Sequence, residues 1–223
     1  MTQREKVVDH VSQMMMTLGI KSVRMDDVAT ALGMSKRTLY ELFGDKEELL
    51  YQSVIHLMDQ RYANLAEQVQ GCSNMIERLL KSVRLLISYG SVDEMGKRLA
   101  YNMKKFYPSV FERVQKVNYE RSLSDLHYAL DKCLEEGYID PTVDVELMTR
   151  LFFMSMNAFV TDMQLSLPFG VTREEAFGAM VVNFLRGLST VKGLQLIDEI
   201  LLREPRPKTL QERRQELSGK EIN

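Results

Sequence analysis

The chain contains no tryptophan, and only two cysteines and five prolines occur among its 223 residues. Two cysteines, Cys72 and Cys133, are too few for a disulfide framework and are typical of a reducing compartment. No stretch without a charged residue is longer than 11 residues, which is too short for a membrane-spanning helix. Because the first ten residues mix both signs of charge and lack an apolar core, we expect no signal peptide and a cytoplasmic location.

An excess of either charge is also missing. Lysine and arginine total 29 against 31 aspartates and glutamates, so the formal net charge is −2. This balance argues at first against nucleic acid, because DNA-binding domains usually carry a basic excess. A charged content of 27% and an apolar content of 45% exclude wholesale disorder. The length permits one or two domains with a full hydrophobic core.

The chain does have helical periodicity throughout, and no convincing period-two run of β-branched residues interrupts it. Apolar residues from Val7 to Leu18 recur at helical spacing and predict a first helix that ends at Gly19. Glycines, prolines and capping residues delimit the others, so the sequence predicts an all-α protein. The further predicted helices are 26–32, 36–43, 46–70, 74–89, 93–106, 109–136, 142–166, 172–190 and 194–203.

The two short predicted helices, 26–32 and 36–43, indicate a helix-turn-helix. Gly33 supplies the tight turn, and the Ser35 hydroxyl is placed to cap the second helix. Helical spacing turns Leu39 and Phe43 inward in that second helix. The residues left facing outward suit a DNA groove, because they offer cations, hydroxyls and a ring: Lys36, Arg37, Thr38 and Tyr40.

The motifs of this stretch are Val28-Ala29, Gly33-Met34-Ser35, Thr38-Leu39-Tyr40, Phe43 and Lys46-Glu47-Glu48-Leu49. At these spacings the sequence resembles the TetR/AcrR family of bacterial transcriptional regulators. The resemblance implies a three-helix DNA-binding domain over residues 1–46 and a helical ligand-binding and dimerisation domain over 47–203. Residues 204–223 are then a charged C-terminal tail. By the same resemblance, Lys36, Arg37, Thr38 and Tyr40 contact bases or phosphates, and Lys46 contacts a phosphate. The expected DNA-binding residues also include Arg24 and Ser35.

One departure from the family pattern concerns the first short helix. Many relatives cap it with serine or threonine where this chain has Arg24, which cannot accept a backbone hydrogen bond but can reach a phosphate. Asp26 and Asp27 complement the dipole of that helix, yet they place negative charge near DNA. Residues 1–50 hold 7 basic and 8 acidic residues, so we expect weak non-specific DNA binding. The alternative is a dimeric small-molecule-binding protein whose helix-turn-helix no longer reads DNA.

The C-terminal half is apolar and rich in methionine. Segment 145–163 is apolar nearly all round, so it is buried on more than one side. By resemblance, the last long helices pair with their copies in a homodimer; the alternative is an ordinary core. The expected interface residues are Phe152, Phe177, Met180, Val181, Phe184 and Leu188. The expected pocket for a small, apolar effector is lined by Met103, Phe106, His127, Met154, Asn157 and Phe159, any of which could instead be core.

The spacing of histidines and the motifs in the sequence give no support for catalysis. His10, His56 and His127 lie far apart and belong to no metal-binding spacing, and no phosphate-binding or nucleophile motif occurs. We therefore expect no enzymatic activity, no metal and no cofactor. The basic pairs Lys97-Arg98 and Lys104-Lys105 are expected to be a solvated helix face. The prediction is a ligand-responsive repressor that binds a palindromic operator as a homodimer.

Overall fold

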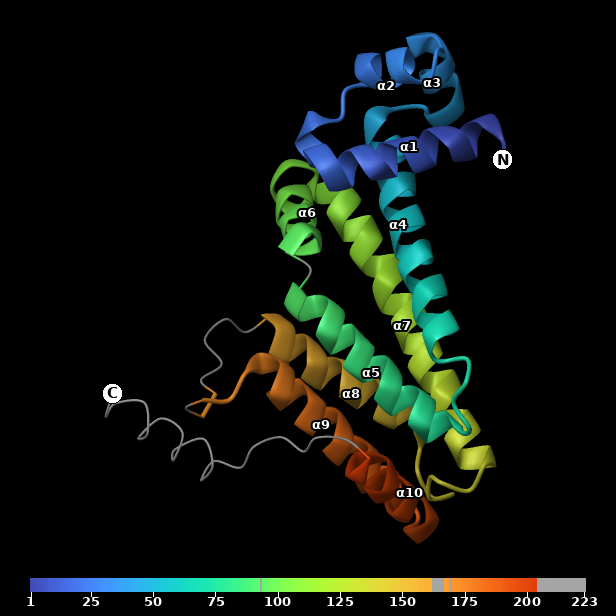
Figure 1. Ribbon diagram of the computed structural model, residues 1–223, viewed down its shortest axis with the longest axis vertical. Helices are drawn as coiled ribbons and strands as arrows, with labels where there is room; N and C mark the ends of the chain where they lie inside the picture. Colours follow the sequence, from blue (N-terminus) through green and yellow to red (C-terminus); the bar gives the residue numbers. More distant parts are fainter. Residues whose placement is uncertain (93, 162–166, 169, 204–223) are drawn as a thin grey trace, which may run out of the picture. The chain divides into compact units, whose positions relative to one another are not determined.

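In the computed structural model, the described secondary structure consists of ten α-helices and one 3-10 helix (Figure 1). The structure describes residues 1–92, 94–161, 167–168 and 170–203, without the side chains of 86–92, 94, 157–161 and 174. The helices are α1 (Gln3–Leu18), η1 (Ile20–Ser22), α2 (Met25–Ala31), α3 (Lys36–Phe43), α4 (Lys46–Gln68), α5 (Met75–Val92), α6 (Glu94–Phe106), α7 (Pro108–Glu135), α8 (Val145–Thr161), α9 (Arg173–Leu188) and α10 (Val191–Leu202).

The predicted all-α class is confirmed, and the predicted helices lie within a few residues of the observed ones. Gly19 ends α1 with a φ of 86°, and the Thr172 hydroxyl and Glu175 carboxylate form the predicted capping box of α9. The predicted last turn of the helix at 142–166 and the charged tail 204–223 lie outside the described residues.

The chain divides into two compact units. Unit 1 comprises Met1–Gln68 and Tyr89–Ser122, and unit 2 comprises Val69–Ser88 and Leu123–Asn223. The three N-terminal helices thus share unit 1 with α4, α6 and the first half of α7, while α7 continues into unit 2. The predicted boundary at residue 46 lies inside unit 1, at the start of α4, and the division of functions that it marks stays a prediction.

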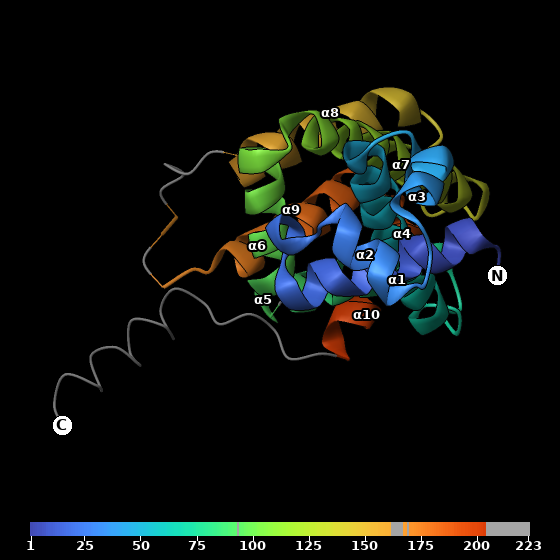
Figure 2. The same cartoon turned by 90° about the horizontal axis from the view of Figure 1, so that it is seen from above.

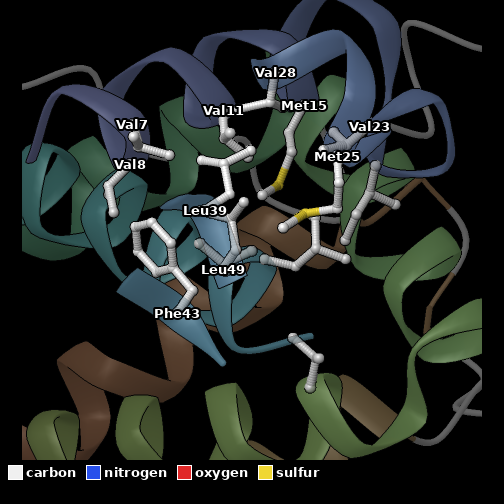
Figure 3. Packing of buried hydrophobic residues seen from close by; sticks show 14 of the residues in the cluster. Val7, Val8, Val11, Met15, Val23, Met25, Val28, Leu39, Phe43 and Leu49 are labelled. Carbon is white, nitrogen blue, oxygen red and sulfur yellow. The ribbon is translucent and has the colours of Figure 1, made fainter. Parts of the chain in front are cut away.

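Unit 1 is built around α1, which lies together with α2 and α3 in both views (Figures 1 and 2). Figure 3 shows Val11 and Met15 of α1 beside Val28 of α2, with Leu39 of α3 below them. The buried side chains of α1 recur at i, i+4 spacing because an α-helix turns every 3.6 residues. Ser12 of α1 donates its hydroxyl to the Ser53 carbonyl of α4 at 2.9 Å, which satisfies both groups where the two helices cross.

Unit 2 holds a second core from α5, α7, α8, α9 and α10. The loop after α7 pairs with the turn between α9 and α10 through an isolated antiparallel bridge, Ile139 to Ser189. In that pairing the Asp140 amide donates to the Leu188 carbonyl, and the Thr190 amide donates to the Tyr138 carbonyl, each at 2.9 Å. The ring centres of Phe152 on α8 and Phe184 on α9 lie 4.7 Å apart.

Candidate nucleic-acid interface

The turn between α2 and α3 has the predicted geometry. Gly33 adopts a φ of 62°, a left-handed conformation that costs glycine least. The Met34 amide donates to the Ala29 carbonyl at 3.0 Å, which closes the end of α2. The Ser35 hydroxyl accepts from the Thr38 amide at 3.0 Å, so the predicted N-cap of α3 is confirmed.

Helix α3 presents one face to the core and another to solvent. Leu39 and Phe43 are buried, and the Arg4 guanidinium of α1 lies 5.1 Å from the centre of the Phe43 ring. Lys36, Arg37 and Tyr40 are exposed. The half-buried Thr38 places its hydroxyl 2.9 Å from that of Ser35, so these two candidate DNA contacts also bond to each other. The predicted outward set therefore shares one surface of unit 1.

Both cations of α3 are paired with carboxylates, which the sequence reasoning did not anticipate. The Lys36 ammonium lies 3.0 Å from the Asp26 carboxylate of α2, and the hydrogen bond and charge of Asp26 raise the pKa of Lys36. Arg37 donates to Glu41 at 2.8 Å one turn further along α3. The i, i+4 spacing of Arg37 and Glu41 could have indicated the second pair, whereas the first depends on how α2 and α3 cross.

The two remaining DNA candidates lie at helix starts. Arg24 occupies the N-cap position of α2, is exposed, and makes no capping hydrogen bond with its side chain. Lys46 begins α4, where Asp45 accepts from the Glu48 amide at 2.7 Å. The Lys46 ammonium donates to the Tyr107 hydroxyl at 2.9 Å, so a phosphate would have to compete with Tyr107 for it.

Polar contacts join α4 to α7 within unit 1. Arg113 donates to Glu48 at 2.8 Å and stacks 3.8 Å from the centre of the Tyr51 ring. A hydrogen bond from Gln52, with the hydrogen bond and charge of Arg113, lowers the pKa of the Glu48 carboxyl. Arg121 donates to Asp59 at 2.7 Å further along the same two helices. Helix α4, which follows the helix-turn-helix, is thus tied to α7 by directional bonds as well as by apolar packing.

The predicted effector-pocket residues fall in both compact units. Met103 is buried in the core of unit 1, and Phe106 lies beneath the Lys21 ammonium at 4.0 Å from its ring centre. In unit 2, His127 contacts Asp131 at 3.1 Å, and Met154 is 68% exposed. The side chains of Asn157 and Phe159 lie outside the described ones. The effector pocket stays a prediction.

The predicted dimer-interface residues are mostly covered within their own protomer. Phe152, Val181 and Leu188 are buried in unit 2, and Phe177, Met180 and Phe184 are half-buried. The exposed apolar residues of α8 instead follow a separate line with helical spacing. They are Leu147, Leu151 and Met154. The predicted interface residues also stay a prediction.

Metal-binding and reactive groups are sparse in the part of the chain that the structure describes. Within it, no three histidine, cysteine or acidic side chains converge as metal ligands. Burial raises the pKa of the Cys133 thiol to about 12, which leaves it a weak nucleophile. None of the described helices combines the length and the apolar composition needed to cross a membrane.

A capped helix with an exposed cationic and aromatic face, carried on a glycine turn, is a helix-turn-helix of the kind that DNA-binding proteins use. Residues 12–52 match the family model described as bacterial regulatory proteins of the tetR family. This part of the chain is therefore similar to bacterial regulatory proteins of the tetR family. The sequence resemblance is thereby confirmed.

Similar proteins extend this match beyond the first 52 residues. The chain is 23% identical over 159 residues to the HTH-type transcriptional repressor KstR2 of Mycobacterium tuberculosis, covering 67% of this chain and 75% of the relative. A putative TetR-family regulator from Mesorhizobium loti has a TM-score of 0.58 at 22% identity, covering 85% of this chain and all of that one. A putative transcriptional regulator from Saccharomonospora viridis, in complex with choline, has a TM-score of 0.55 at 13% identity. The match covers 84% of this chain and 97% of that one. These structures share the fold of this chain.

Proposed function

We propose that the protein is a cytoplasmic repressor that binds a palindromic operator as a homodimer and leaves it when a small apolar molecule binds. The observation that carries the proposal is α3, whose Ser35 cap and buried Leu39 orient Lys36, Arg37 and Tyr40 toward solvent. The N-terminal turns of a recognition helix are the ones that meet base edges and phosphates in the major groove. Repression is inferred from the relative that is itself a repressor.

The proposed dimer follows from the geometry of operators. A palindrome presents two half-sites about 34–36 Å apart, so two copies of α3 must be held at that separation. On α8, Leu147, Leu151 and Met154 form an exposed apolar stripe with i, i+4, i+7 spacing. An exposed apolar stripe on a long helix is what a two-fold helical interface would cover.

Replacing Leu151 by lysine is expected to weaken this dimer because a charge would be buried in an apolar interface. We expect the protein concentration at which half of the dimer dissociates to rise at least about tenfold, as measured by analytical ultracentrifugation. Val191→Lys is the matched control, since Val191 is 72% exposed and lies on α10, a different helix from the stripe. Equal dimer affinity of both variants and the wild type would exclude α8 from the interface.

The proposed effector site lies in the helices after α4. The similar structure in complex with choline supports the existence of a small-molecule effector, and the methionine-rich composition supports an apolar site, since methionine repacks readily around ligands. Of the predicted lining residues, His127, Asn157 and Phe159 belong to unit 2, where we place the site. Helix α7 runs through both units and bonds to α4 through Arg113 and Arg121, so it offers a route from effector to α3.

Release would follow if the effector favours a conformation in which the two α3 helices no longer match the half-site spacing. Because Lys46 is bonded to Tyr107 at the junction of α6 and α7, a shift there would also move a proposed phosphate contact.

The alternative function is a ligand-binding protein with an inactive helix-turn-helix, and the paired cations Lys36 and Arg37 are the observation in its favour. Fluorescence anisotropy with the DNA upstream of the gene separates the two functions. For a DNA-binding regulator, a plot of log K for DNA binding against the logarithm of the salt concentration should be a falling straight line. Its slope should steepen by about 0.9 for each phosphate that the protein neutralises. Failure to bind that DNA or any duplex at low salt would favour the alternative.

A further inference from the structure

Each of the two cations of α3 forms an ion pair with a carboxylate. The Asp26 carboxylate lies 3.0 Å from the Lys36 ammonium, and the Glu41 carboxylate lies 2.8 Å from the Arg37 guanidinium. All four side chains are exposed, so the pairs sit on the surface that faces DNA in the proposed function. Asp27 and Arg24 lie on the same short segment. The six charges of this surface therefore sum to zero.

Binding to a phosphate requires each cation to leave its carboxylate. An exposed ion pair contributes little to stability, so exchanging the carboxylate for a phosphate costs little. The carboxylate left behind then stands beside the phosphate and repels it. Non-specific DNA binding depends almost wholly on phosphate contacts, whereas operator binding adds base contacts that no other sequence supplies. Repulsion between the carboxylate and the phosphate therefore removes a larger share of the affinity for non-operator DNA than of the affinity for the operator.

We propose that Asp26 and Glu41 are specificity-determining residues that hold Lys36 and Arg37 away from non-operator DNA. This inference rests on the proposed DNA-binding function and adds a role for acidic residues within it. It also explains why the proposed DNA-reading surface has no net charge. The ion pairs release their cations to phosphates only where base contacts compensate for the loss of the carboxylate partner.

Asp26 and Asp27 provide a matched pair for the test. They are adjacent in the first turn of α2, carry the same charge and are both exposed. Asp26 bonds to Lys36, whereas within the described residues Asp27 makes no ion pair. Asp26→Asn and Asp27→Asn thus remove the same charge from α2, but only the first releases Lys36. Glu41→Gln and Glu47→Gln give a second pair, since the exposed Glu47 of α4 makes no ion pair within the described part of the chain either.

The full chain and these four variants are titrated by anisotropy against a random-sequence duplex of about 30 bp, between about 50 and 200 mM salt. We expect Asp26→Asn to tighten binding about fivefold and to steepen the salt slope by about 0.9, because one more phosphate is neutralised. Asp27→Asn should tighten binding by less than half of the factor expected for Asp26→Asn. Glu41→Gln should likewise exceed Glu47→Gln, and thermal unfolding should match the wild type for each variant.

Several results would overturn the inference. Equal gains for Asp26→Asn and Asp27→Asn would mean that only total charge matters, and the proposed function would stand. Weaker binding of the upstream DNA by Asp26→Asn, with unchanged binding of the random duplex, would assign Asp26 to base recognition instead. No duplex binding by the wild type or any variant would contradict both the inference and the proposed function.

Discussion

Replacing Tyr40 by alanine is expected to lower the affinity for the operator about tenfold or more, with little effect on stability. Tyr40 lies in the second turn of α3 and is 42% exposed, so its ring supports the core less than its neighbour Leu39 does. In the proposed complex its hydroxyl reaches a phosphate oxygen that fixes the register of α3 in the groove. Losing that contact should raise the dissociation constant measured by anisotropy with the DNA upstream of the gene.

Two controls separate the hydroxyl contact from other effects of this change. Tyr40→Phe keeps the ring and removes only the hydroxyl, so it should reproduce most of the loss. Tyr101→Ala removes a tyrosine that is 65% exposed on α6, amid the basic face expected to be solvated, and should leave DNA affinity unchanged. Wild-type affinity of Tyr40→Ala would contradict the assignment of α3 as the recognition helix.

Replacing Gly193 by alanine is expected to destabilise unit 2 by about 3 kcal/mol or more. A Cβ atom at this position would lie 2.1 Å from the Tyr138 carbonyl oxygen and 3.0 Å from the Ser189 Cβ. The turn before α10 would have to move, which would break the hydrogen bond from the Thr190 amide to the Tyr138 carbonyl. Thermal unfolding followed by circular dichroism should show a midpoint lowered by about 10 °C.

Gly71→Ala is the control for that experiment. Nothing lies within 4 Å of a Cβ built at Gly71, and its backbone conformation is open to other residues. Its unfolding midpoint should equal that of the wild type or rise slightly, because alanine restricts the unfolded chain. If Gly193→Ala unfolded at the wild-type temperature, the docking of the α7–α8 loop against α10 would be wrong.

Most of the helix-turn-helix could be predicted from the sequence because its determinants are local. The turn at Gly33, the Ser35 cap and the inward side chains Leu39 and Phe43 all follow from residues three or four positions apart, and the structure confirms each. The candidate effector pocket was harder to predict. Methionine and phenylalanine suit a core as well as a pocket, and periodicity does not distinguish the two.

By itself, the sequence determined the all-helical class, the position of the helices and the surface that α3 presents, since hydrogen bonds within a helix and its caps join near neighbours. Only the tertiary structure decided what those side chains meet. Lys36 bonds to Asp26 ten positions earlier, Lys46 bonds to Tyr107, and Gly193 admits the Tyr138 carbonyl. Such contacts depend on how helices cross, and the crossings are set by the packing of whole cores, which no local pattern encodes.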